Sequence, residues 1–260
     1  MKKPVFHWIK EGEGPVVVLS HALGCDLRMW DGVAEILQAR YTVLRYDHRG
    51  HGQSEAPPGP YTMALLAEDA AGLIKVQTQG LVHFVGLSMG GMVAQALAAS
   101  QPKLLKSLVI ANAANYYDEA ARALWQARIG TVRAQGVSVI ADGAMQRWFT
   151  PEFRADQAGG GAARVAALRR QLEKTDAAAY ATSCEAVAAI DFRASNAAIT
   201  CPALVIAGTH DEATPLALSQ AIADSIAGAQ LRTLEAAHLS AVEQPQAFAS
   251  LLESFFEGVK

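Results

Sequence analysis

The chain contains the run Gly86-Leu87-Ser88-Met89-Gly90, in which a glycine stands two residues before and two residues after a serine (G-x-S-x-G). Residues 81–85 before it are apolar, as in a buried strand, and the small residues at 91–100 after it are typical of a helix. A sharp strand-to-helix turn would hold Ser88 at the helix N-terminus, where the helix dipole stabilises negative charge. Flanking glycines let neighbouring backbone pass without a clash with Cβ. The run therefore predicts Ser88 as a nucleophile.

Two other interpretations of this glycine-rich turn are weaker. A phosphate-binding loop would end in Gly-Lys-Ser or Gly-Lys-Thr, and the chain has neither this ending here nor a G-x-G-x-x-G motif. A turn with an incidental serine is the other alternative. The strand before the motif and the helix after it favour the nucleophile.

Apolar runs elsewhere predict the surrounding sheet. Further strands are expected at residues 16–20, 41–46, 108–111, 203–207 and 230–234. These runs are continuous rather than alternating, which indicates strands covered on both faces, as in a parallel sheet. Helical spacing of apolar residues recurs at 62–76, 216–226 and 245–256. The sequence thus predicts an α/β fold with a mostly parallel central sheet and helices on both faces.

The alternation of strands and helices stops between residues 117 and 198. This segment is rich in Ala, Arg and Gln, contains no convincing strand, and includes three consecutive glycines at 159–161 that indicate a flexible loop. We expect a helical cap, or lid, inserted over the carboxyl ends of the strands. The expected core domain is then made of residues 1–116 and 199–260.

Serine is a weak nucleophile at neutral pH and needs a base. Of the seven histidines, His238 follows the last predicted strand, where this kind of fold carries its base. Asp211 follows the preceding strand, with Glu212 beside it, and would orient the imidazole and stabilise imidazolium. The alternative for Asp211 is a loop acid that caps the helix beginning near Pro215.

Acyl transfer also needs two hydrogen-bond donors for the oxyanion. One is expected to be the backbone N–H of Met89, directly after the nucleophile. The second is expected from the loop after the strand at 16–20, where Leu23 is the candidate. Only backbone groups take part, so the side chains constrain this assignment little.

Bulk composition limits the classes of function. Hydrophobic residues make up 51% and charged residues 18% of the 260 residues, so the chain can bury a sizeable core. The 22 basic and 25 acidic side chains give a formal charge of −3, with no basic run, which disfavours nucleic acid as a partner.

The sequence also bears on location. The three cysteines form no C-x-x-C motif and are interpreted as free thiols in a reducing compartment. No signal peptide and no apolar run of about 18 residues is apparent, so we expect a cytoplasmic protein that does not enter the membrane. Whether it is a monomer or a homo-oligomer stays open.

Several segments together resemble a known family. They are residues 21–30, 45–54, 86–92, 207–211 and 237–240, with 180–186 and 190–193 in the expected cap. Over nearly its whole length the chain resembles α/β-hydrolases, and it looks most like the 3-oxoadipate enol-lactonases of aromatic catabolism. The resemblance implies the α/β-hydrolase fold and hydrolysis of an enol-lactone ring without a metal or organic cofactor. One departure leaves the substrate open: many of these lactonases have Asn-Ser where this chain has Ser20-His21, and His21-Ala22 is closer to the His-Gly of general esterases.

The expected cap also offers candidate substrate contacts. A lactone with a free carboxylate would need a cation, and the cap contains Arg122, Arg128, Arg133 and Arg147. Trp125 and Arg128 share one helical face, and with Trp148 they are expected to line the pocket for a lactone or acyl group. The alternative is that the tryptophans pack the cap onto the core and the arginines are solvated.

The sequence offers three hypotheses of function. Hydrolysis of an enol-lactone is the main hypothesis, and a general carboxylesterase for short acyl esters is the alternative. Both use a small-molecule substrate and an acyl-enzyme on Ser88. A non-catalytic binding protein is a third class, which the complete set of Ser, Asp and His disfavours. A dehalogenase or epoxide hydrolase would usually have Asp in place of Ser88.

Overall fold

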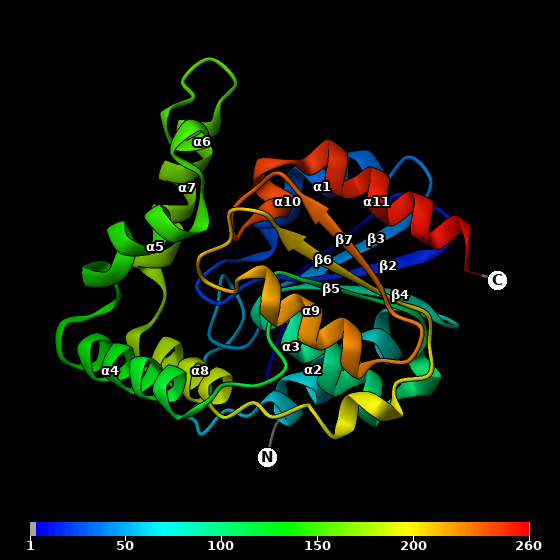
Figure 1. Ribbon diagram of the computed structural model, residues 1–260, viewed down its shortest axis with the longest axis horizontal. Coiled ribbons are helices and arrows are strands. Elements are labelled where there is room, and N and C mark those ends of the chain that lie inside the picture. Colours follow the sequence, from blue (N-terminus) through cyan, green and yellow to red (C-terminus); the bar gives the residue numbers. More distant parts are fainter. Residues whose placement is uncertain (1–3, 260) are drawn as a thin grey trace.

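A seven-stranded sheet crosses the structure, a computed structural model that describes residues 4–259 (Figure 1). Its strands are β1 (Trp8–Glu11), β2 (Val16–Ser20), β3 (Thr42–Tyr46), β4 (Val82–Leu87), β5 (Leu105–Ala111), β6 (Ala203–Gly208) and β7 (Gln230–Leu234). They lie in the order β1-β3-β2-β4-β5-β6-β7, and only β1 runs antiparallel to its neighbour. The predicted, mostly parallel sheet is confirmed.

Strand β1 was not among the strands expected from sequence. Its four residues alternate between exposed and half-buried positions, and it lies at the edge of the sheet against β3. An edge strand of this kind has no continuous apolar run, so the signal that identified the central strands is missing. The short helix α1 (Asp31–Leu37) was not predicted either.

Helices cover both faces of the sheet, as Figure 1 shows. On one face lie α1, α10 (Ser240–Glu243) and α11 (Pro245–Glu257), and on the other lie α2 (Met63–Gln77), α3 (Met89–Ser100) and α9 (Leu216–Ser225). Short 3-10 helices occur at η1 (Leu27–Trp30), η2 (Pro102–Leu104), η3 (Val137–Ile140) and η4 (Ser195–Ala198). The central strands β2 and β4 are almost completely buried between these layers. Within residues 4–259, no helix has both the length and the apolar character needed to cross a membrane.

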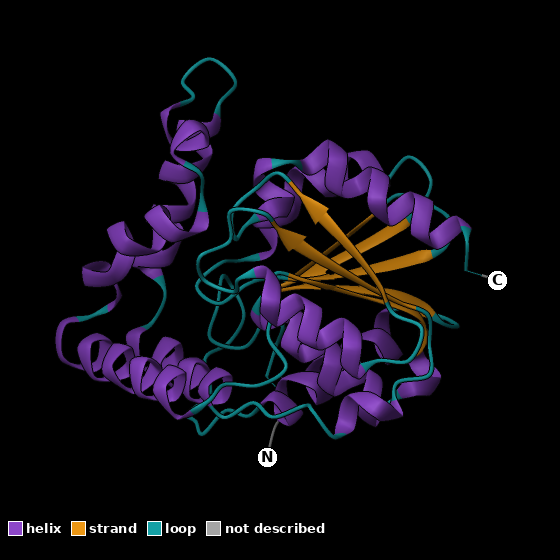
Figure 2. Ribbon diagram, viewed as in Figure 1, coloured by secondary structure: helices purple, strands orange, loops and turns teal. Residues whose placement is uncertain are grey.

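Between β5 and β6 the chain forms only helices and loops (Figure 2). We call residues 119–188 the insertion; its helices are α4 (Glu119–Gln135), α5 (Ala141–Trp148), α6 (Pro151–Ala155), α7 (Gly161–Lys174) and α8 (Ala177–Ala188). They lie on the side of the sheet toward which the parallel strands point. The glycine-rich loop falls between α6 and α7. The division into a cap and a core domain remains a prediction.

The two segments that flank the insertion lie side by side. Tyr116 and Asp191 form an isolated antiparallel bridge, and the N–H of Phe192 donates to the carbonyl oxygen of Asn115 at 2.7 Å. The chain therefore leaves the core and returns to it at neighbouring points.

The turn at residues 86–90 explains why both of its glycines are needed. Ser88 has φ 57° and ψ −115°, a conformation that L-residues rarely adopt. A Cβ atom on Gly86 would lie 2.0 Å from the carbonyl oxygen of Gly90, and one on Gly90 would lie 2.1 Å from the carbonyl oxygen of Ser20. Helix α3 can approach β2 and β4 this closely only because the two residues have no side chain.

We expect Gly90→Ala to lower the free energy of unfolding by more than about 3 kcal/mol, because its Cβ would meet backbone that cannot move aside. Gly130→Ala in α4 is the matched control. A Cβ there meets nothing within 4 Å, so the substitution should stabilise the protein by about 0.5–1 kcal/mol. Urea unfolding followed by circular dichroism measures both. Equal effects of the two substitutions would contradict this explanation of the turn.

Candidate active site

Three loops at the carboxyl ends of β4, β6 and β7 bring Ser88, Asp211 and His238 together. His238 Nε2 lies 2.9 Å from Ser88 Oγ, and His238 Nδ1 lies 2.9 Å from Asp211 Oδ2. A carboxylate only accepts hydrogen bonds, so Nδ1 carries the proton and Nε2 of the neutral ring accepts from the Ser88 hydroxyl. The sequence predicted these three residues, and the structure places His238 within hydrogen-bond distance of both Ser88 and Asp211.

Asp211 is held as a buried carboxylate. Oδ1 accepts from the N–H groups of Ala213 and Thr214, at 2.8 and 2.9 Å. Oδ2 accepts from Asn112 Nδ2 at 2.9 Å and from Thr214 Oγ1 at 2.7 Å. Burial acts to raise the pKa of Asp211, but the charge of His238 and these hydrogen bonds outweigh it and lower the pKa to about 2. Asp211 is therefore ionised over the whole physiological pH range.

The alternative role for Asp211, as the cap of the next helix, does not hold. Helix α9 begins after Pro215 and has no side-chain hydrogen bond at its N-terminus. The carboxylate instead closes the turn over residues 211–214, and its other oxygen faces His238.

Sequence reasoning missed two residues of this network, Asn112 and Thr214. Asn112 directly follows β5 with φ 47°; besides its bond to Asp211, its Oδ1 accepts from Ser240 Oγ at 2.6 Å. Thr214 Oγ1 also lies 3.3 Å from His238 Nδ1. A polar residue at the carboxyl end of a predicted central strand was the available signal for Asn112. Thr214 had no comparable signal.

Of the two expected oxyanion donors, Met89 directly follows Ser88 and Leu23 lines the same cavity. Met89 is the first residue of α3, so its N–H has no acceptor within the helix. Leu23 lines the same cavity as Ser88, and its N–H makes no hydrogen bond within the described residues. The loop before it is fixed by buried His21, whose Nδ1 donates to the carbonyl of Ala22 at 2.8 Å and whose Nε2 accepts from the N–H of His48 at 2.9 Å.

A cavity of about 400 Å³ adjoins Ser88 and His238, between the core and the insertion. All three candidate substrate contacts, Trp125, Arg128 and Trp148, line it. The Arg128 guanidinium lies 4.8 Å from the centre of the Trp125 ring. The rest of the wall includes Tyr117, Leu124, Tyr180 and Val187.

Two of the four arginines considered from sequence reach this cavity. Arg128 and Arg147 line it, and among residues 4–259 neither has an acidic group within 4 Å. Burial and then the charge of Arg128 lower the pKa of Arg147. Arg122 instead stacks on Tyr116 at 5.4 Å, and Arg133 pairs with Glu185 at 2.7 Å.

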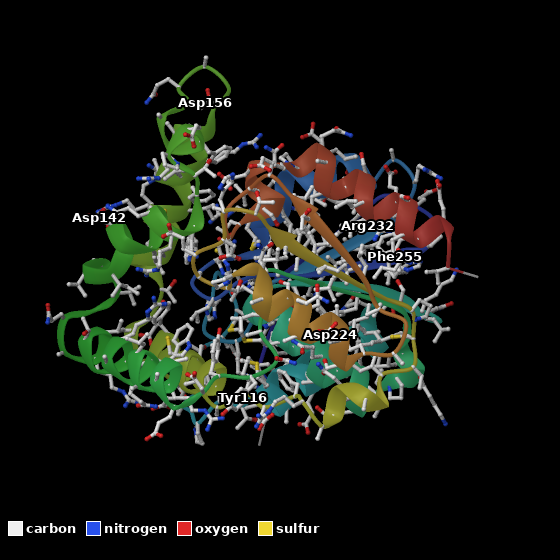
Figure 3. All side chains as sticks on the ribbon, viewed as in Figure 1. Tyr116, Asp142, Asp156, Asp224, Arg232 and Phe255 are labelled. Carbon is white, nitrogen blue, oxygen red and sulfur yellow. The ribbon has the colours of Figure 1, made fainter. Side chains whose placement is uncertain are left out.

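Figure 3 shows how the side chains are distributed. Tyr116 lies where the insertion joins the core, and Asp156 lies at the tip furthest from the sheet.

Cys25, Cys184 and Cys201 are all unpaired. In the part of the chain that the structure describes, no three His, Cys, Asp or Glu side chains are arranged to hold a metal ion.

Comparisons with known proteins identify the family of the chain. The family model described as alpha/beta hydrolase fold matches residues 15–245. The chain is 39% identical to 3-oxoadipate enol-lactonase 2 of Acinetobacter baylyi over 244 residues, 94% of this chain and 89% of that protein. The crystal structure of the enol-lactonase from Burkholderia xenovorans LB400 superposes with a TM-score of 0.92 at 37% identity, covering 98% of this chain and 97% of that one.

A thermophilic esterase from Thermogutta terrifontis, in a structure with malate bound, is also similar. Its TM-score is 0.90 at 27% identity, with 98% of this chain and 94% of that chain covered. The family model spans most of the chain, and the similarity to the enol-lactonases extends over nearly all of it. The chain therefore belongs to the α/β-hydrolase family, and within that family it resembles the 3-oxoadipate enol-lactonases.

Proposed function

We propose that this chain is a serine hydrolase for a small lactone or ester that carries a free carboxylate, and that 3-oxoadipate enol-lactone is its substrate. One observation carries the choice of substrate: Arg128 and Arg147 line the cavity at Ser88 without an ion-pair partner within 4 Å among the described residues. Partly buried cations without counter-ions are unfavourable, and a substrate carboxylate would supply the missing charge. Guanidinium groups suit this task because they bind carboxylates through paired N–H donors.

One acidic residue also lines the cavity. Glu212 is exposed, and among the groups that shift the pKa of Arg147 its charge has the smallest effect. It therefore compensates one of the two arginines in part and leaves the cavity suited to an anion.

The relatives support the same substrate class. The enol-lactonases of Acinetobacter baylyi and Burkholderia xenovorans act, by their names, on an enol-lactone, and the Thermogutta esterase was solved with the dicarboxylate malate. A carboxylate-binding cavity next to a serine nucleophile is consistent with both.

The geometry suggests how each group acts. Ser88 Oγ attacks the lactone carbonyl carbon while His238 Nε2 takes its proton, and Asp211 stabilises the imidazolium that forms. The N–H groups of Leu23 and Met89 stabilise the oxyanion. When the ring C–O bond breaks, His238 returns the proton to the leaving enol oxygen. Water, deprotonated by His238, then attacks the acyl-enzyme, and His238 returns the proton to Ser88 Oγ as the enol acid is released. The enol then tautomerises to the oxo acid.

A general carboxylesterase for short acyl esters is the alternative. It is favoured by the apolar part of the cavity wall, which includes Leu124, Trp125 and Val187. Such an enzyme would turn over p-nitrophenyl acetate and butyrate but not the lactone. The paired assay of the lactone and these two esters therefore decides between the two functions.

Ser88→Ala should abolish hydrolysis of both substrate types, with kcat/KM lower by about 10³-fold or more, because no other group can form the acyl-enzyme. The Tm should stay within about 2 °C of wild type, because a single hydroxyl is removed. Ser100→Ala, at the exposed C-terminal end of the same helix, is the control and should keep full activity. Near-wild-type turnover by Ser88→Ala would exclude Ser88 as the nucleophile.

Arg128→Gln and Arg147→Gln should each lower kcat/KM for the lactone by about 10- to 100-fold, the value of a charge-assisted hydrogen bond. Hydrolysis of neutral p-nitrophenyl butyrate should change by less than about threefold, because it has no carboxylate. Arg133→Gln, on the same insertion but outside the cavity, should leave both rates unchanged. If the two arginine variants slow both substrates equally, neither arginine is a carboxylate anchor.

The lowered pKa of Asp211, about 2, predicts a pH-dependent contribution to stability. A carboxylate whose pKa is lower in the folded than in the unfolded state stabilises the fold above its unfolded pKa, and this contribution is lost as the pH falls through the folded value. The free energies of unfolding of wild type and Asp211→Asn should therefore converge by about 2 kcal/mol between about pH 4 and pH 2. Urea unfolding across this range measures the difference. A constant difference would mean that Asp211 does not ionise with a lowered pKa.

A further inference from the structure

The segment that carries His238 is held from two sides. On the core side, Ser240 Oγ donates to Asn112 Oδ1 at 2.6 Å. On the other side it meets the junction between helices α5 and α6 of the insertion, where the N–H of Leu239 donates to the carbonyl oxygen of Trp148 at 3.1 Å. The residue after His238 is thus bonded directly to a residue of the cavity wall.

Glu243 makes a second connection between the same two segments. Its Oε1 accepts from both the N–H and Oγ1 of Thr150, at 2.8 and 2.7 Å. Its Oε2 accepts from the N–H of Ala237 at 2.5 Å. Ala237 immediately precedes His238, so a single carboxylate joins the insertion to the backbone that carries the base.

This carboxylate is placed where a charge is unfavourable. Glu243 is 8% exposed, and among residues 4–259 no cationic side chain lies within 4 Å of it. Three neutral donors satisfy it instead, through charge-assisted hydrogen bonds. An apolar residue would hold α10 against the core at less electrostatic cost. Unlike an apolar residue, a carboxylate can accept hydrogen bonds on both of its oxygens, here from the segments of Thr150 and Ala237.

We propose that Glu243 is a positioning residue that acts through His238. It fixes the backbone at Ala237 relative to the α5–α6 junction, so that His238 Nε2 meets Ser88 Oγ. The proposal rests on the role assigned to His238 above. Glu243 does not touch the cavity, so its effect on the reaction passes entirely through the position of the base.

Glu243→Gln tests this most directly, because the amide is isosteric but presents an NH₂ group where one oxygen accepted. Facing Ala237 or Thr150, that group opposes an N–H donor, and one of the two connections is lost. A displacement of the base by a fraction of an ångström to 1 Å lowers kcat by about 10- to 100-fold. We expect that loss of kcat on p-nitrophenyl acetate, with KM changed by less than about threefold.

Asp69→Asn is the matched control. Its carboxylate is about as buried and pairs with Arg49, but it lies outside the cavity. This variant should lose stability while kcat per active site, titrated with a fluorophosphonate, stays at the wild-type value. Thr150→Val removes one donor to Glu243 and leaves the bond to Ala237, so it should lower kcat by only about two- to fivefold.

A proton spectrum gives a readout that needs no substrate. The Nδ1 proton of His238, shared with Asp211, should give a far-downfield resonance that is sharp in wild type and in Asp69→Asn. In Glu243→Gln it should be broadened or shifted because the histidine segment is no longer fixed. Glu243→Gln with wild-type kcat per active site and an unchanged resonance would show that Glu243 only stabilises the fold.

Other outcomes are also informative. If Glu243→Gln does not fold, Thr150→Val decides, and an unchanged kcat and resonance in that variant would overturn the proposal. If the wild-type protein hydrolyses neither the lactone nor the esters, the proposed function fails, while the resonance still reports whether Glu243 positions His238.

Discussion

Helix α3 approaches the backbone of β2 so closely that no side chain fits between them. Gly86 and Gly90 permit this contact, and the chain between them must take the positive φ seen at Ser88. The turn fixes the serine above the carboxyl ends of the central strands, where the loops after β6 and β7 begin. Because neighbouring parallel strands keep their register, these loops bring Asp211 and His238 to the same edge. A steric restriction at two glycines thus sets the geometry of hydrogen bonds between residues far apart in sequence.

The charged groups of the site are satisfied in two different ways. Asp211 is fully satisfied by protein groups, since the N–H groups of its own turn, Asn112, Thr214 and His238 all meet its two oxygens. Arg128 and Arg147 have no acidic partner of this kind among the described residues. The first arrangement holds the base in one tautomer before any substrate arrives. The second leaves an electrostatic requirement that an anionic ligand can meet, so in the proposed function the groups that perform chemistry are separate from those that select the substrate.

The sequence predicted those parts of the molecule whose signal is local. The five central strands were recognisable because continuous apolar runs mark strands buried on both faces, whereas β1, a short edge strand of alternating exposure, had no such run. Strand β7 was also predicted, although it lies at the other edge of the sheet and only Leu234 in it is buried. Ser88, Asp211 and His238 could be assigned because their order along the chain and their places after strands are fixed by the fold. Asn112 and Glu243 could not be predicted, since the roles proposed for them depend on contacts with residues about 100 positions away. Similarly, the rotation of α4 and α5 decides that Arg128 and Arg147 face the cavity while Arg122 and Arg133 do not.

The bridge between Tyr116 and Asp191 has a consequence for how such a protein can diverge. Because the two ends of the insertion meet, the helices between them can be lengthened, shortened or exchanged without pulling on β5 or β6. Selectivity can then evolve, or be engineered, by grafting a different set of helices onto an unchanged sheet. One contact between the insertion and the core limits this exchange, however. A transplanted insertion that lacks donors at the position of Thr150 would leave Oε1 of Glu243 without a partner, so the new insertion should supply equivalent donors there.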